Sequence, residues 1–210
     1  MVKVAEKQLY DVHPGLAMVQ KWVAELKEKT GRTLEEWIAL ARSEGPKEGQ
    51  ARREWLMKKH KMGTNSARWI SDRVAGKGGE EDSPEAYLKT AVVYVEEQYA
   101  GAKAKLRPIY EELLRMGRSV GTDVKACPCK TMVPLYREHV FAQIKPTTNT
   151  RIDLGFALTH FKGKLPKRLI DTGGMAKKDR ITHRIEIRAA REIDGEVRKW
   201  LKTAYDLDAN

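Results

Sequence analysis

The chain has 210 residues, of which 41% are hydrophobic and 33% charged, and its formal net charge at pH 7 is +11. This composition is ordinary for a soluble protein of one large or two small domains. It excludes a membrane span, which needs roughly 18 consecutive apolar residues, and two cysteines exclude a disulfide scaffold. The first fifteen residues lack the apolar core of a signal peptide, so we expect a cytoplasmic protein with no membrane partner.

Helical periodicity dominates residues 1–75 and predicts a small helical domain. A first helix runs from Pro14 to Gly31, with proline at its start and glycine past its end. A second opens at Thr33 with the spacing of a capping box. A third covers about residues 48–61, and a short fourth begins at residues 64–66.

Each of these four helices carries one tryptophan, at Trp22, Trp37, Trp55 and Trp69. A buried indole removes some 200 Å² or more from water, so we expect the four rings to anchor the core of a bundle. The alternative is a platform on which nucleic-acid bases stack.

Basic side chains are predicted to be exposed on the third and fourth helices. They are Arg52, Arg53, Lys58, Lys59, Lys61 and Arg68. Two short helices joined by a glycine turn are similar to helix-turn-helix DNA-binding modules, so these residues form a secondary basic patch. The alternative is a structural bundle that docks on the rest of the chain or on a partner protein, which would make the chain an interaction adaptor.

Residues 76–84, "GKGGEEDSP", predict a polar linker and the best domain boundary. A helix follows from Ser83–Pro84, Gly101 interrupts it, and a second apolar face continues to about Met116. The second domain is therefore predicted over residues 85–210, with a start as late as residue 101.

Alternating apolar residues beyond Val124 change the period from about 3.6 to 2, which is typical of half-buried strands. The segments are residues 139–144, 150–158 and 180–187. In the last segment, Ile181 is predicted to face inward. Residues 159–180 predict a mobile, lysine-rich loop, and a closing helix starts near residues 193–194. The expected fold class is α+β: a helical bundle, then a two-layer domain with helices on one face of a mostly antiparallel sheet.

The positive charge is concentrated in the second half of the chain. Residues 1–100 have a net charge of +1 and residues 101–210 a net charge of +10. Such a concentration favours a phosphate-rich partner such as nucleic acid, because each bound phosphate releases condensed counterions. The alternative is a solvated basic surface. The expected ligand-binding residues are Lys130, Arg137, Lys145, Arg151, Lys177, Lys178, Arg180, Arg184 and Arg188.

Asp153 is the acidic residue at the centre of this basic region. We expect it to pair with a neighbouring arginine. A metal-dependent nuclease would need a second carboxylate, for which Glu186 is available, but the usual Asp…Glu-x-Lys arrangement is missing. The sequence also has no Gly-rich phosphate loop, Ser-His-Asp arrangement or H-E-x-x-H motif, so no catalytic residue and no cofactor is predicted.

Cys127 and Cys129 flank a proline, a spacing shorter than the C-x-x-C redox motif. In an extended segment both thiols point to one face, so the alternatives are a metal site and a reversible redox pair. The preferred interpretation is two small thiols at a strand edge, where the proline also fits.

Several phrases in the second half resemble a bacterial domain of unknown function, DUF5655: "LRPIYEELL", "VKACPCKTMVPLYREHVFAQIKPTTNTRIDLGFAL", "THRIEI" and "EVRKWLKTAY". The helical segment "KTGRTLEEWIALARSEGP…EWLMKKHKMGTNSARWI" is similar to DUF4287, a small domain often found upstream of it. Together the resemblances cover most of the chain and imply two parts but no reaction. The occurrence of DUF5655 beside nuclease-like modules implies an association with nucleic acid.

The sequence thus predicts a non-catalytic protein that binds nucleic acid or another phosphate-rich ligand on its C-terminal basic face. One alternative is a small-molecule pocket between sheet and helices, over Phe156 and Trp200, with the lysine loop as a lid. A broad basic surface favours the polymer, and a deep apolar cavity the small ligand.

Overall fold

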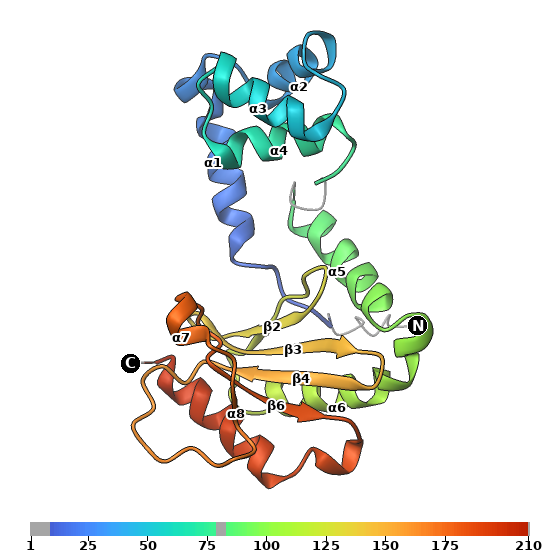
Figure 1. The fold of residues 1–210 in the computed structure, drawn as a ribbon, viewed down its shortest axis with the longest axis vertical. Helices are drawn as coiled ribbons and strands as arrows, with labels where there is room; N and C mark the ends of the chain where they lie inside the picture. Colours follow the sequence, from blue (N-terminus) through green and yellow to red (C-terminus); the bar gives the residue numbers. More distant parts are fainter. Residues whose placement is uncertain (1–8, 79–82, 210) are drawn as a thin grey trace, which may run out of the picture. The chain divides into compact units, whose positions relative to one another are not determined.

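The computed structural model describes residues 9–78 and 83–209 (Figure 1). The chain divides into two compact units, one of residues 13–87 and one that combines residues up to Val12 with residues from Leu88 onward. The linker predicted at residues 76–84 falls partly on residues 79–82, which lie outside the described residues. None of the helices within the described ranges combines the length and the apolar composition that a membrane crossing requires.

The first unit contains the four predicted helices. They are α1 (Gly15–Thr30), α2 (Leu34–Ser43), α3 (Gly49–Lys59) and α4 (Thr64–Val74). Gly31 ends α1 in the left-handed region at φ 78°, which only glycine adopts without strain. Thr33 forms the predicted capping box with Glu36, which satisfies two N–H groups at the start of α2.

Among the tryptophans of this unit, Trp37 lies in the core as expected, and the other three are half-buried. Trp37 is 2% exposed and belongs to a buried cluster with Leu26, Leu56 and Ile70. Trp22 is half-buried and donates from its indole N–H to Ser66 Oγ at 2.8 Å. The rings are therefore held by packing and hydrogen bonds as bundle anchors.

The prediction that Arg52 is exposed is wrong. Its side chain is buried, because its guanidinium donates to Ser71 Oγ and O and to the carbonyl oxygens of Pro46 and Lys47. Five fixed N–H donors allow one arginine to satisfy four acceptors from two segments. Arg52 thus holds the loop before α3 against α4 and is not part of an exposed patch.

The second unit is an α+β domain built on one antiparallel six-stranded sheet of order β1-β2-β3-β4-β6-β5. The strands are β1 (Lys125–Ala126), β2 (Val133–Tyr136), β3 (Val140–Thr148), β4 (Arg151–Phe156), β5 (Ile170–Asp171) and β6 (His183–Ile187). Its helical elements are the end of α5 (Pro84–Gln98), the 3₁₀ helix η1 (Gly101–Leu106), α6 (Arg107–Arg118), α7 (Gly174–Lys177), the 3₁₀ helix η2 (Ala190–Glu192) and α8 (Gly195–Leu207).

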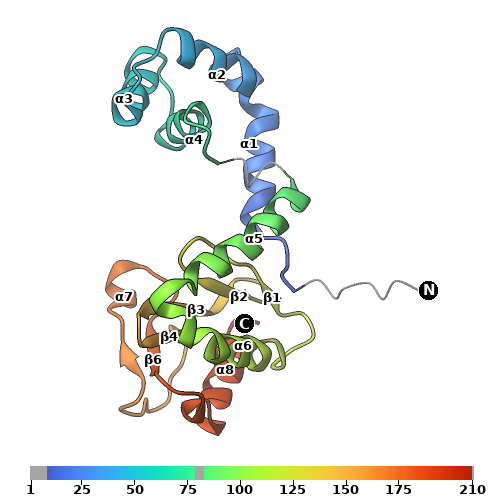
Figure 2. The same ribbon diagram turned by 90° about the vertical axis from the view of Figure 1, so that its right-hand side faces the viewer.

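Helices α6 and α8 lie on the same side of this sheet (Figures 1 and 2). The strands supply fully buried Ile144, Leu154 and Ile185, and the helices supply Leu113 and Leu201. Burial of such side chains contributes about 1.5–3 kcal/mol each, so one face of every central strand is committed to the core. The opposite face, called the outer face below, is left for other contacts, as the predicted alternation requires.

Ile181 is buried, as predicted, but it does not lie on the same face of the sheet as Ile185. A Cβ added to Gly155, which lies on the outer face of β4, would come within 2.6 Å of Ile181 Cγ2. Ile181, which lies just before β6 begins at His183, therefore covers the outer face of β4. Gly155 makes this close approach possible.

The segment predicted as a mobile loop contains β5 and α7, so this expectation is wrong for residues 170–177. Thr172 N donates to Thr182 O at 3.0 Å and Thr172 Oγ1 donates to Ile181 O at 2.8 Å. Asp179 N donates to Gly174 O at 2.9 Å. These bonds tie the segment to the start of β6.

Candidate nucleic-acid interface

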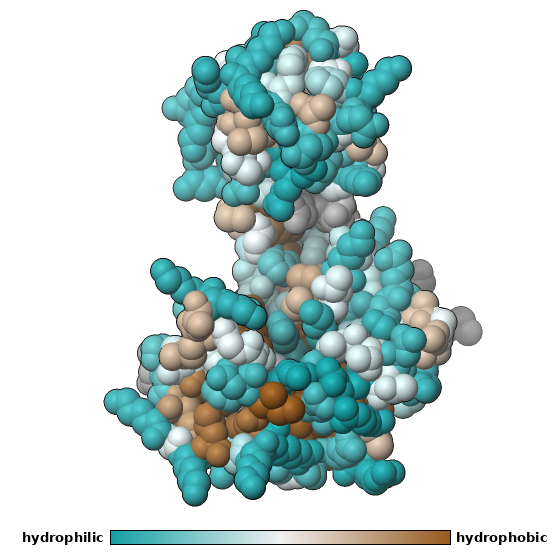
Figure 3. Space-filling view, in the orientation of Figure 1, coloured by the Kyte–Doolittle hydropathy of each residue, from teal (hydrophilic) through white to brown (hydrophobic). Residues whose placement is uncertain are grey.

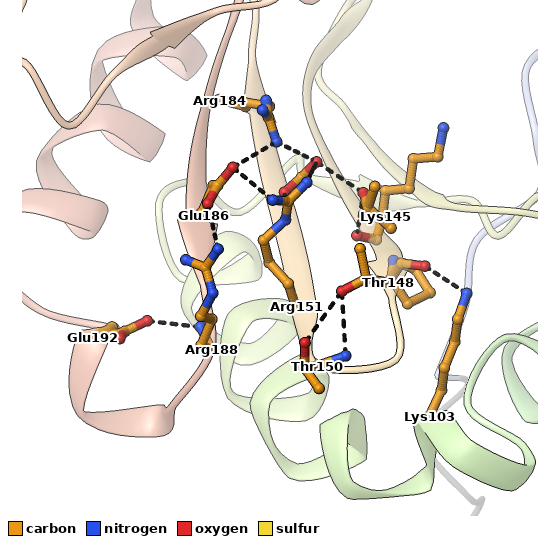
Figure 4. A network of polar contacts seen from close by, with 12 residues as sticks. Lys103, Lys145, Thr148, Thr150, Arg151, Arg184, Glu186, Arg188 and Glu192 are labelled. Carbon is orange, nitrogen blue, oxygen red and sulfur yellow. Dashed lines mark hydrogen bonds and ion pairs between the residues drawn. The ribbon is translucent and has the colours of Figure 1, made fainter.

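Charged side chains on the outer face form a continuous network across β4 and β6 (Figure 4). Arg151 Nε lies 2.8 Å from Asp153 Oδ1, and Arg184 Nη1 lies 2.6 Å from Asp153 Oδ2. Glu186 accepts from all three arginines of the region, Arg151, Arg184 and Arg188, at 2.7, 3.1 and 2.8 Å. The prediction that Asp153 pairs with a neighbouring arginine is confirmed.

The register of the sheet creates this network. Asp153 stands opposite Glu186, and Gly155 stands opposite Arg184 on the neighbouring strands β4 and β6. Because side chains of alternate residues share a face, the two carboxylates and the three arginines project together. We call Arg151, Arg184 and Arg188 the arginine row.

The arginine row carries three positive charges, and the two carboxylates that pair with it neutralise only two of them. The carboxylates are mostly buried, with Asp153 12% and Glu186 19% exposed, while Arg188 is 54% exposed. A guanidinium has five N–H donors, so an arginine held by one or two carboxylate bonds keeps donors for a further anion. Hydrophilic side chains lie over part of this face, and a hydrophobic area lies directly beside them (Figure 3).

A cavity of about 530 Å³ adjoins this network and is lined by Lys103, Lys130 and Lys145. We call it the lysine cavity. Lys145 belongs to β3, Lys130 to the connection between β1 and β2, and Lys103 to η1. Within the described part of the chain, none of the three makes an ion pair, and Lys103 Nζ donates to Pro146 O at 2.7 Å. The lysine cavity thus concentrates positive charge that no described carboxylate neutralises by direct contact.

Two residues of this cavity, Lys103 and Gln98, were not predicted from the sequence. Gln98 lines the cavity at the end of α5 and is 7% exposed. Its Nε2 donates to Cys129 O at 2.7 Å and so fixes the connection that carries Lys130. The sequence shows a lysine shortly after Gly101 but no pattern that places it in a cavity. The position of both residues depends on the packing of α5 and η1 against the β1–β2 connection.

Arg137 does not join the outer-face network. Its Nε lies 3.2 Å from Asp123 Oδ2, its Nη1 donates to Tyr205 O, and its guanidinium lies over the Tyr205 ring at 4.3 Å. The hydrogen bond that Tyr205 OH donates to Asp123 is the main cause of the lowered pKa of this carboxyl group. The positive charge of Arg137 lowers it further. Arg137 therefore connects β2 to α8.

The three predicted residues of the α7 region lie together. Lys177, Lys178 and Arg180 line a cavity of about 510 Å³ with Gln143 and other residues of the sheet. Arg180 Nη2 lies 2.7 Å from Asp208 Oδ1, and the Asp208 side chain is 1% exposed. Arg180 is thus already engaged by a carboxylate near the C-terminus of the domain. The two lysines make no ion pair with a described residue.

The remaining residues of the N-terminal basic patch are separated by acidic partners. Lys58 pairs with Glu54 at 3.4 Å, and Lys59 pairs with Glu44 at 3.5 Å. Arg53 donates to Gly49 O and Gln50 Oε1 on its own helix. Arg68 is exposed on α4. With Arg52 buried, this patch is a weaker candidate than the outer face of the sheet.

No disulfide joins Cys127 and Cys129. Cys127 is fully buried, and its burial, with the nearby Asp11 carboxylate, raises the pKa of the thiol to about 12. A thiol with this pKa is a poor nucleophile and a poor metal ligand at neutral pH. Within residues 9–78 and 83–209, no three His, Cys, Asp or Glu side chains are grouped so that they could hold a metal ion.

The pocket expected over Phe156 and Trp200 involves two core side chains. Phe156 is fully buried and Trp200 is 3% exposed. Phe161 packs edge-on against Trp200 at 5.2 Å between ring centroids. Both residues therefore contribute to the core between the sheet and α8.

Comparison with known families gives two matches. A model described as Domain of unknown function (DUF4287) matches residues 18–74, and one described as Domain of unknown function (DUF5655) matches residues 95–208. The resemblances seen in the sequence are thereby confirmed. No curated protein and no solved structure matches the chain. Because the second match spans more than half of the 210 residues, the chain belongs to the DUF5655 family.

Proposed function

We propose that the second unit is a non-catalytic module that binds nucleic acid on its outer face. The binding surface consists of the lysine cavity and the arginine row. The observation that carries the proposal is the lysine cavity, where Lys103, Lys130 and Lys145 come from three separate segments and make no ion pair with a described residue. Lysines that line one cavity with a single carboxylate repel one another, and a phosphate reduces that repulsion.

The two parts of the surface have complementary roles in the proposal. Arginine binds phosphate through two parallel N–H donors, and the row is already oriented by Asp153 and Glu186. Lysine acts as a mobile point charge and tolerates variation in phosphate position. Contacts of both kinds are independent of base sequence, so we expect affinity without strong sequence preference.

Fluorescence anisotropy of the full chain with a labelled 20-nucleotide probe, single-stranded and duplex, tests this proposal. We expect the logarithm of the association constant to fall linearly with the logarithm of salt concentration. The double variant Lys130→Gln/Lys145→Gln removes two phosphate contacts, so it should lower the steepness of that line by about 1.5.

The matched control is Lys199→Gln/Lys202→Gln, which removes the same charge from α8, on the other side of the sheet. We expect this variant to keep the wild-type salt dependence. Binding that does not change between about 50 and 200 mM salt, or that both double variants weaken equally, contradicts the proposal.

A further inference from the structure

The lysine cavity differs from the arginine row in shape, and this difference bears on which phosphate it takes. Its walls come from the end of α5, η1, the β1–β2 connection and the end of β3 with the turn that follows, so it is a wide recess of about 530 Å³ that opens to solvent beside the sheet face. A volume between 300 and 1,000 Å³ is typical of sites for small ligands. A polymer can cross the row, whereas a recess accommodates the end of a chain or a single nucleotide.

The charge of the cavity fits a phosphomonoester better than a phosphodiester. Three lysines line it against one carboxylate, Glu97. A phosphomonoester carries a charge of about −1.5 to −2 at pH 7 and three terminal oxygens. A backbone phosphodiester carries one negative charge, which the exposed Arg188 of the row can already bind. The net positive charge of the recess is therefore neutralised better by a terminal phosphate than by a backbone phosphate.

Gln98 supplies an independent observation. Its Oε1 is buried and has no hydrogen-bond partner among the described residues, while its Nε2 is engaged by Cys129 O. An unsatisfied buried acceptor costs about 1–3 kcal/mol, so such groups usually have a partner, which can be an ordered water or a ligand. The acceptor lies on a residue that lines the cavity. The nucleoside of a nucleotide carries hydroxyl and amino donors beside its phosphate, so it can satisfy this acceptor while the phosphate stays among the lysines.

We propose that the lysine cavity binds the phosphomonoester of a nucleotide, with Lys103, Lys130 and Lys145 around the phosphate and Gln98 Oε1 accepting from the nucleoside. This inference rests on the proposed function, because it places the phosphorylated end of a nucleic-acid strand in the lysine cavity, which is part of the proposed binding surface. The same chemistry is offered by a phosphorylated end of a strand and by a free nucleotide.

The test compares internally labelled oligonucleotides of one sequence that carry a 5′-phosphate, a 3′-phosphate or hydroxyl groups at both ends. We expect one phosphorylated form to bind at least about tenfold more tightly than the hydroxyl form, a difference of the size that charge-assisted bonds give. Lys130→Gln should reduce this advantage to less than about threefold, and Lys199→Gln on α8 should leave it intact.

Calorimetric titration with adenosine monophosphate, adenosine and inorganic phosphate separates the two sources of the ligand. Tight binding of the monophosphate alone, with no affinity for any oligonucleotide, supports a free-nucleotide site and contradicts the proposed nucleic-acid function. Equal affinity for all three oligonucleotides overturns the phosphomonoester assignment and leaves nucleic-acid binding standing. Inorganic phosphate that binds as tightly as the monophosphate overturns the role given to Gln98.

Discussion

Lys145 and Asp153 occupy directly opposed positions on β3 and β4, yet no ion pair joins these two described residues. Asp153 is held by Arg151 at 2.8 Å and by Arg184 at 2.6 Å, and Thr147 Oγ1 also donates to it at 2.8 Å. The carboxylate is therefore already engaged by Arg151 of its own strand, by Arg184 of β6 and by Thr147 of β3. Lys145 is left to line the neighbouring cavity, which explains how a sheet face with acidic residues retains unpaired positive charge.

Gly155→Ala should destabilise the second unit. The added methyl group would lie 2.6 Å from Ile181 Cγ2 and 3.0 Å from Gln143 Cγ, so the covering segment must shift. We expect a loss of about 1–3 kcal/mol in the free energy of unfolding, measured by urea denaturation. Ile181→Ala removes the clash, so the double variant should lose less than the sum of the two single variants. Additive losses contradict this account.

Arg52→Met should destabilise the helical unit although it keeps most of the apolar stem. The substitution leaves Ser71 O and the carbonyl oxygens of Pro46 and Lys47 without their donor. We expect a loss of about 1–3 kcal/mol, followed by tryptophan fluorescence during urea denaturation. Arg53→Ala, one position along the same helix, is the matched control and should change stability by less than about 0.5 kcal/mol.

His60 should make the helical unit sensitive to mild acid. Its ring lies between Trp37 and Trp55, and burial, with the charges of Lys59 and Arg32, lowers the pKa of His60 from 6.5. As the pH falls, His60 therefore binds a proton in the unfolded chain before it does so in the folded chain. The free energy of unfolding is thus constant at high pH and decreases as the pH drops through about 6.5.

Urea denaturation of the full chain between pH 5 and 8 measures this effect. His60→Phe keeps an aromatic ring and should flatten the profile. Burial also lowers the pKa of His13, so His13→Gln should remove a separate part of the slope. A His60→Phe variant with the wild-type slope contradicts the assignment.

Cys127 should resist alkylation in the folded protein. The thiol is fully buried and its pKa is raised to about 12, so the thiolate fraction at pH 8 is very small. Mass spectrometry after iodoacetamide treatment should find Cys127 modified only once denaturant is present. The variant Cys129→Ser isolates its signal, and rapid modification of that variant without denaturant contradicts the burial.

The sequence predicted local structure well where a local pattern specifies it. The capping box at Thr33, the glycine end of α1 and the alternation in β4 all depend on neighbouring residues, and the structure has each of them. Arg52 and Ile181 were misplaced for a different reason. Each is positioned by contacts with segments distant along the chain, and residue type alone favours an exposed arginine and an inward isoleucine.

The candidate site was predicted in its composition but not in its grouping. Arg151, Arg184 and Arg188 follow from strand alternation, and the structure brings them together. Arg137 has the same charge but pairs with Asp123 and lies over Tyr205, which depends on where α8 ends. Lys103 lies on a 3₁₀ helix, and no strand or helix pattern connects it to Lys145, more than 40 positions away. Pairings of this kind require the tertiary fold.

Asp153→Asn separates the structural from the binding role of the arginine row. The asparagine keeps the size of the side chain but removes the charge that Arg151 and Arg184 share. Loss of a mostly buried carboxylate leaves two guanidinium groups poorly compensated, so we expect the free energy of unfolding to fall by about 1–3 kcal/mol. The same change frees N–H donors and raises the net positive charge of the outer face, so affinity for a 20-nucleotide probe should rise several-fold.

The opposed signs of these two effects make the experiment informative. Asp206→Asn on α8 removes an exposed carboxylate that pairs with Lys202, so it changes the net charge equally at a site away from the outer face. If the arginine row contacts phosphate, Asp153→Asn strengthens binding more than Asp206→Asn does, and its salt dependence becomes steeper. An Asp153→Asn protein that is less stable but binds like the Asp206→Asn control shows that the row only braces the sheet, and nucleic-acid contact is then confined to the lysine cavity.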